Sequence, residues 1–264
     1  MANARNVGDH LPPFNYSGQR AHFNNPISAK INTNPDRYFL EEYFSQKPGI
    51  NADIVIDPDA DDATALAAFV IANKHFEILG TGGSTDDVTF SATVAGIVLE
   101  TDASASQQVI IAPHLDTNQT AWQVIKWGTE NQVVWECILR TAASVADIVI
   151  WAGLKLTNTS AVATDADQAF FRFDAVVANW EATTSIADTD VEKDTGIVVA
   201  ASTNYYLRIE LDADRKAHFF IDDKEVYIST ALTNDIDFIP YVGVEGNAKS
   251  IVLVAEKISR IIFE

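Results

Sequence analysis

Residues 205–211, Tyr-Tyr-Leu-Arg-Ile-Glu-Leu, and residues 217–221, Ala-His-Phe-Phe-Ile, show the clearest strand pattern in this chain. In the first segment the apolar residues alternate with Arg208 and Glu210, so that one face of a strand is apolar and the other charged. The second segment alternates in the same phase, and a third follows at residues 226–228. The pattern predicts a three-stranded antiparallel meander with one buried face and one wet face.

Similar apolar and β-branched runs recur from about residue 76 to the end of the chain, separated by short turn-rich pieces. They lie at 88–100, 108–112, 122–127, 133–140, 148–156, 170–173, 197–201, 241–244 and 251–263. Short strands at this spacing are typical of sandwiches and barrels. Because no helical pattern longer than a turn or two competes with them, we predict an all-β jelly-roll sandwich at residues 76–264.

Residues 1–50 differ from this body because they are rich in Asn and Pro and have neither a helical nor a strand period. Proline removes a backbone donor and favours extended backbone, so we predict an extended N-terminal arm. Seven aromatic residues are spaced along it: Phe14, Tyr16, Phe23, Tyr38, Phe39, Tyr43 and Phe44. We expect these rings to dock on a neighbouring subunit, and packing on the chain's own domain is the alternative.

Residues 51–75 form the predicted linker between the arm and the body. Within it, residues 60–74 are alanine-rich and start with aspartates that can cap a helix, which predicts one short helix. The run Asp57–Asp62 resembles the calcium-binding start of nucleoside hydrolases, but Val55 and Asp59 replace an aspartate and a glycine of that motif. A β-rich body also does not suit that enzyme fold. A nucleoside hydrolase is therefore the last alternative, and a cation site in the acidic run stays open.

Charge is unevenly distributed along the chain. The net charge is −19, and because residues 1–50 are net +1, residues 51–264 carry −20. Such a body repels phosphate backbones and anionic lipid surfaces, so neither nucleic acid nor a membrane is an expected partner. No apolar run reaches the roughly 18 residues of a spanning helix, and residues 1–6 lack the apolar region of a secretory signal. We expect the protein to be kept in a cytoplasm until assembly or lysis.

The sequence holds no catalytic or metal-ligating constellation, so no catalytic residue, metal or cofactor is predicted. The five histidines lack zinc spacing, and His114 with Asp116 has no nucleophile beside it. Glu136 and Glu181 lie on predicted strands and are interpreted as surface charges rather than as a glycosidase pair. Cys137 lies in an apolar run and is expected to be a buried, unreactive thiol.

Five tryptophans bear on sugar binding, because an aromatic ring beside polar loops can serve as a platform for a sugar. Trp135 and Trp151 lie within apolar runs and are expected in the core. Trp122, Trp127 and Trp180 are candidate sugar-binding residues, with burial in the core as the alternative.

The late strands resemble the concanavalin A-like, or laminin G-like, jelly roll. That family has a strand of the pattern Y-x-L-x-I, which residues 205–209 match, followed by a hairpin of the pattern F-Y-I-D-G, which residues 219–223 match in part. Asp223 stands where the family has its turn glycine. The match covers about residues 130–264, and it implies a jelly-roll sandwich, a fold that hosts many functions.

The Asn- and Pro-rich arm and the texture of the whole chain resemble the structural proteins of tailed phages. This resemblance implies a non-catalytic virion protein, assembled in the host cytoplasm. The first expectation is a homo-oligomeric capsid decoration or cement protein whose arm binds neighbouring capsid or virion subunits. The alternative is a carbohydrate-binding, lectin-like module of a phage tail or fibre adsorption device. The arm favours the first hypothesis, whereas exposed tryptophans would favour the second.

Overall fold

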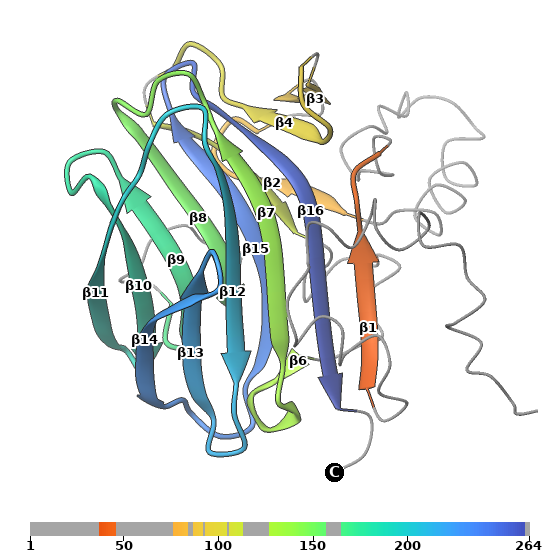
Figure 1. The fold of residues 1–264 in the computed structure, drawn as a ribbon, viewed down its shortest axis with the longest axis vertical. Coiled ribbons are helices and arrows are strands. Elements are labelled where there is room, and N and C mark those ends of the chain that lie inside the picture. The colour runs from red at the N-terminus through yellow and green to blue at the C-terminus, as the bar shows by residue number, and fades with distance from the viewer. Residues whose placement is uncertain are drawn as a thin grey trace, which may run out of the picture.

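The computed structural model describes residues 37–45, 76–83, 87–91, 93–104, 106–112, 127–156 and 165–261. Within these residues there is no α-helix, and hence no helix that could cross a membrane. Two antiparallel sheets pack face to face (Figure 1), which confirms the predicted all-β jelly-roll sandwich. The strands are β1 (Arg37–Glu42), β2 (Glu77–Leu79), β3 (Val88–Phe90), β4 (Ile97–Glu100), β5 (Gln107–Ala112), β6 (Trp127–Gly128), β7 (Val134–Thr141), β8 (Ile148–Lys155), β9 (Gln168–Asp174), β10 (Asn179–Ile186), β11 (Thr189–Val198), β12 (Asn204–Leu211), β13 (Lys216–Ile221), β14 (Lys224–Ala231), β15 (Asp237–Gly246) and β16 (Ser250–Ile261).

The order of strands brings together segments that are far apart in the sequence. The first sheet runs β14-β13-β12-β7-β16-β4-β3, with β1 paired to β16, and it faces the viewer in Figure 1. The second sheet runs β11-β10-β9-β8-β15-β5-β2, with β6 paired to β15. The C-terminal strands β15 and β16 therefore lie inside the two sheets, where each pairs with strands from the first half of the body.

The predicted meander is confirmed as β12, β13 and β14, but other strands differ from the prediction. The run at 88–100 is divided into β3 and β4, which pair as a hairpin. No apolar run marked β10, which the sequence analysis expected only as the strand that carries Glu181, and most of β11 was not predicted. Their sequences, NWEATTSI and TDVEKDTGIV, are largely polar, and β11 is the edge strand, most of whose residues are exposed. An edge or polar-faced strand has too little apolar alternation to be detected from the sequence.

The core lies between the inner faces of the two sheets and is rich in aromatic side chains. The rings of Phe171 and Phe219, one from each sheet, meet edge-to-face with centroids 5.2 Å apart. Trp180 packs on Tyr205 across the same layer, at 5.5 Å. Contacts of this kind contribute roughly 0.5–1.5 kcal/mol each beyond the burial of apolar area. Cys137 is buried, as predicted, and burial raises the pKa of its thiol.

Part of the predicted arm belongs to the sandwich. All six residues of β1 pair with β16, and Tyr38 is partly exposed there. Phe44 is completely buried, with its ring 5.4 Å from that of Phe76. Tyr43 packs against the chain's own apolar cluster around Ile138. Docking on a neighbouring subunit was therefore the wrong expectation for Phe44, which is completely buried within the chain, whereas for the half-buried Tyr43 it stays a prediction.

The remaining predictions for the N-terminal region lie outside the described residues. These are the anchors Phe14, Tyr16 and Phe23, the side chain of Phe39, the helix at 60–74 and the acidic run Asp57–Asp62.

Candidate functional site

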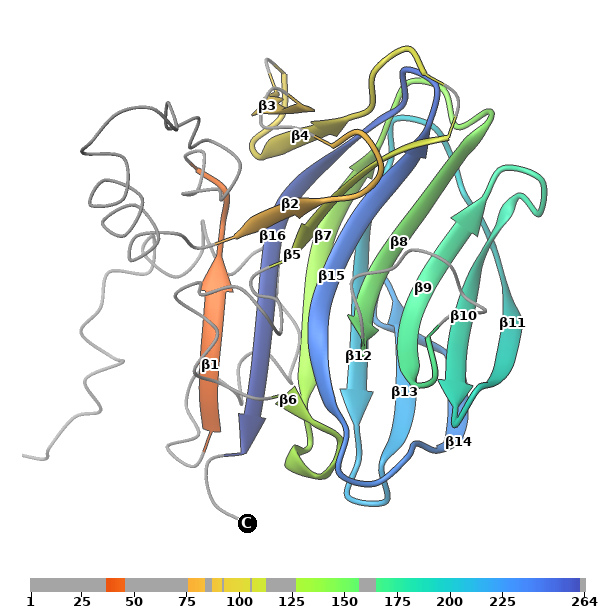
Figure 2. The same cartoon turned by 180° about the vertical axis from the view of Figure 1, so that it is seen from behind.

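Outward-facing side chains of the second sheet lie in rows across the strands, because the register aligns residues of β15, β8, β9 and β10. Figure 2 shows this sheet from its outer side. The rows are Gly243–Trp151–Arg172–Glu181, Tyr241–Gly153–Phe170–Thr183 and Ile239–Lys155–Gln168–Ser185. We call the group Trp151, Phe170, Tyr241, Lys155, Arg172, Glu181, Thr183 and Ser185 the outer-face site.

The aromatic part of the outer-face site is an apolar cluster separate from the main core. Trp151, Phe170 and Tyr241 pack together with Ile110, and none is more than 3% exposed. Gly153 lies in register between Tyr241 and Phe170. Its φ is +153°, and a Cβ there would lie 2.5 Å from the Cα of Phe170. Only glycine fits this backbone, because a side chain would collide with the neighbouring strand β9.

Lys155 is completely buried beside these rings. Its Nζ lies 3.5 Å from a carboxylate oxygen of Asp165, and 5.1 and 5.3 Å from the ring centroids of Phe170 and Tyr241. Burial lowers the pKa of Lys155, and the charge of Asp165 opposes that change. Burial also raises the pKa of the Tyr241 hydroxyl. The ammonium group is thus held by one carboxylate and two aromatic faces.

Arg172 is the centre of a carboxylate network at the more open end of the site. Its Nη2 lies 3.0 Å from Asp174, and its Nη1 lies 3.2 Å from Glu181 and 3.3 Å from Glu192. Burial raises the pKa of Glu181, and the charge of Glu192 adds to the effect, whereas Arg172 opposes it. These partly exposed charged groups can exchange hydrogen bonds with a polar ligand.

Three hydroxyl oxygens of the outer-face site are buried and have no hydrogen-bond partner: Thr183 Oγ1, Ser185 Oγ and Tyr241 Oη. Buried polar groups are nearly always paired, and an unpaired one costs about 1–3 kcal/mol. Thr183 and Ser185 lie two positions apart on β10, so both side chains point to the outer face. These three unpaired hydroxyls therefore lie on the same outer face of the second sheet as the Arg172 network.

The tryptophans are placed differently from the sequence expectation. Trp127 and Trp180 are completely buried in the main core, so neither is a sugar platform. Trp122 lies outside the described residues. Trp135 is in the core as predicted, but Trp151, also expected there, is buried on the outer face instead. In the run around Trp151 the residues on both faces of the strand are apolar. The sequence of such a strand does not reveal which face is the core.

One of the missed aromatic residues had a weak signal in the sequence. Phe170 and Phe171 are consecutive, so they must point to opposite faces of β9. A strand with bulky aromatics on both faces predicts two apolar surfaces. Tyr241 had no such marker, because its contact with Phe170 and Lys155 depends on β15 lying beside β8.

Glu136 and Glu181 are not surface charges, contrary to expectation. Glu181 is largely buried in the network described above. Glu136 is completely buried on the outer face of the first sheet and accepts a hydrogen bond from the Tyr206 hydroxyl. It stands in register opposite Lys257 on one side and Arg208 on the other. Cross-strand cations account for both buried carboxylates.

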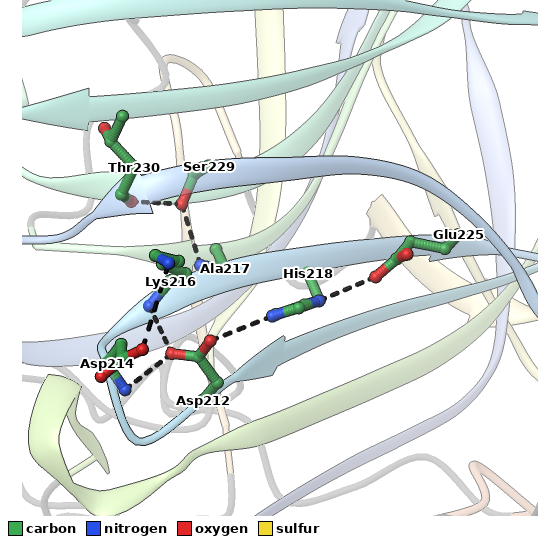
Figure 3. Close-up of polar contacts among 8 residues, drawn as sticks. All are labelled: Asp212, Asp214, Lys216, Ala217, His218, Glu225, Ser229 and Thr230. Carbon is green, nitrogen blue, oxygen red and sulfur yellow. Dashed lines mark hydrogen bonds and ion pairs between the residues drawn. The ribbon is translucent and has the colours of Figure 1, made fainter.

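His218 is the centre of a second polar cluster, on the β12–β14 meander (Figure 3). Its Nδ1 lies 2.7 Å from Glu225, and its Nε2 lies 3.2 Å from Asp212. Partial burial lowers the pKa of His218, but the hydrogen bonds to the two carboxylates outweigh it and the net change is upward. Ser229 donates to the Thr230 carbonyl and not to the imidazole, so this is no nucleophile–base pair.

The same cluster does not form a metal site, because its two carboxylates bind opposite nitrogens of the imidazole ring. More generally, the described part of the chain has no group of three or more His, Cys, Asp or Glu arranged to hold a metal ion. His114 and Asp116 lie outside it.

Comparison with known proteins shows the fold alone. No family model matches the sequence, and no curated protein matches it significantly. A solved protein of unknown function from Shewanella oneidensis MR-1 has a TM-score of 0.54 and 10% identity, covering 85% of this chain and 87% of that one. A native glycosidic hydrolase has a TM-score of 0.52 and 11% identity, covering 83% and 94%. The carbohydrate recognition domain of Emp47p has a TM-score of 0.48 and 10% identity, covering 71% and 89%.

Proposed function

We propose that this chain is a carbohydrate-binding protein whose ligand contacts the outer-face site. The observation that carries the proposal is that the partly exposed ion pairs of Arg172 lie on the same face of the second sheet as three unpaired hydroxyls. A saccharide has a rim of hydroxyls that both donate and accept hydrogen bonds. Arg172, Asp174 and Glu192 offer partners for that rim.

The native glycosidic hydrolase supports this ligand class, since its structure aligns with most of this chain. Fold likeness at 11% identity is secondary to the site, because unrelated functions share folds.

We propose binding without catalysis. A glycosidase needs two carboxylates with the glycosidic bond between them. Here Glu181 and Glu192 share Nη1 of Arg172, at 3.2 and 3.3 Å. The guanidinium therefore takes the position that a scissile bond would need, and the paired carboxylates are better suited to accepting hydrogen bonds from sugar hydroxyls.

The capsid decoration role stays a prediction. Two of its seven proposed anchors, Tyr43 and Phe44, pack within the chain, and no contact among the described residues favours a capsid partner. A location in a phage tail or fibre adsorption device likewise stays a prediction. It is compatible with the proposed carbohydrate binding.

The test is a panel of immobilised neutral and acidic oligosaccharides, probed with the full chain and two variants. Thr183→Val removes an unpaired hydroxyl at nearly constant shape, so it should weaken glycan binding by about tenfold, or roughly 1.4 kcal/mol. If the hydroxyl is unpaired without ligand, the same change should leave the free energy of unfolding equal or raise it by about 1 kcal/mol.

Thr184→Val is the matched control, because Thr184 is the next residue on β10 and faces the other sheet. It should leave glycan affinity unchanged. Absence of binding to every oligosaccharide by the folded wild type, or equal affinities for wild type and Thr183→Val, would refute the role of the outer-face site.

A further inference from the structure

We infer that the saccharide bound at the outer-face site is uncharged, and that acidic sugars such as uronates are rejected. This inference rests on the proposed carbohydrate-binding function and adds its ligand class. It follows from the balance of charges on the outer positions of β8, β9, β10 and β11.

Carboxylates outnumber cations on this surface. The outward-facing cations of these four strands are Lys155 and Arg172. The outward-facing carboxylates are Asp174, Glu181, Asp190, Glu192 and Asp194, and Asp165 adds a sixth beside Lys155. The formal charge of the surface is therefore −4 when all eight groups are ionised.

Neither cation is available to a ligand carboxylate. Arg172 is engaged by Asp174, Glu181 and Glu192, all within 3.3 Å. Lys155 is completely buried and bound to Asp165. A site for an acidic sugar would instead have an arginine or lysine with unengaged donors pointing at the ligand.

The carboxylates remain good acceptors for uncharged hydroxyls. Glu192 is the most exposed member of the network, with 40% of its side chain accessible, and Asp194 is exposed beside it on β11. Each ligand carboxylate placed about 4 Å from one of them in water would weaken binding by roughly fivefold, which corresponds to about 1 kcal/mol. The surface thus selects for hydroxyls and against acid groups.

The experiment compares oligosaccharides of one backbone with and without charge. Cellohexaose, laminarihexaose, maltohexaose and mannohexaose are titrated into the full chain, each beside its counterpart oxidised at C6 to the uronate. We expect the neutral form that binds to bind at least about tenfold more tightly than its oxidised form at low salt. This difference in affinity should shrink in 1 M NaCl, where the screening length is about 3 Å.

A charge-neutralised variant separates electrostatics from shape. In the variant Glu192→Gln/Asp194→Asn, the ratio of the affinities for the neutral and the oxidised ligand should fall by about fivefold or more. The control is Asp214→Asn/Asp223→Asn, which changes the net charge equally but at exposed turns of the first sheet. It should leave that ratio unchanged.

The outcomes are distinct for the two proposals. An oxidised oligosaccharide that binds as tightly as its neutral form, or more tightly, overturns the inference and leaves carbohydrate binding in place. Failure of the folded protein to bind any neutral or oxidised form overturns the proposed function itself.

Discussion

Glu256 shows how one buried side chain sets a pH dependence. It is completely buried, its Oε1 accepts a hydrogen bond of 2.8 Å from the Trp135 indole, and its Oε2 has no partner. Burial raises the pKa of this carboxyl to about 7, although the indole hydrogen bond lowers it in part. Between the ordinary value of 4.5 and about 7, the folded protein therefore holds a proton that the unfolded chain has lost.

Stability should consequently fall as the pH rises through this window. A shift of this size corresponds to about 3 kcal/mol, fully lost above the folded pKa. Glu256→Gln keeps an acceptor for the indole but cannot ionise, so its free energy of unfolding should change less between pH 5 and pH 8. Urea denaturation at both values measures the difference. Glu100→Gln, an exposed control, should keep the wild-type slope, and an unchanged slope in Glu256→Gln would contradict the assignment.

At the scale of strands, a row of alternating charges crosses the outer face of the first sheet. Glu41 on β1, Lys257 on β16, Glu136 on β7 and Arg208 on β12 are successive register partners. Lys257 lies 3.7 Å from Glu41, and Lys257, Glu136 and Arg208 are all buried. A slip of one residue would turn these charges into the core, so the row helps to specify the register.

Removing one member of this row should be costly. Lys257→Met leaves buried carboxylates without their cross-strand cation, and we expect a loss of about 3–5 kcal/mol in the free energy of unfolding. Adding Glu136→Gln should restore part of that loss, because it removes a charge left behind. Lys224→Met, on the exposed end of β14, is the control and should change stability little. A double variant no more stable than Lys257→Met would argue against the charge explanation.

At the scale of the whole molecule, the position of β1 decides how the arm can be tested. Residues 37–45 contribute an edge strand and the core ring of Phe44. Extending a deletion from residues 1–36 to residues 1–45 should therefore cost at least about 3 kcal/mol of stability, the usual effect of removing a buried phenylalanine. Chemical denaturation of the two truncated chains gives the comparison. Equal stabilities would place residues 37–45 outside the folded unit, and only the shorter deletion is a fair test of the arm.

The all-β class, the meander at β12–β14 and the burial of Cys137 could be predicted from the sequence, because strand alternation and apolar runs are local properties. Tertiary structure alone decided which apolar face became the core and which became the outer-face site. Phe170 and Phe171 are equivalent in the sequence, and only the packing of the two sheets assigns one to each surface. Lys155 meets Tyr241 because β15 inserts beside β8, a pairing between residues some 86 positions apart that no local pattern encodes.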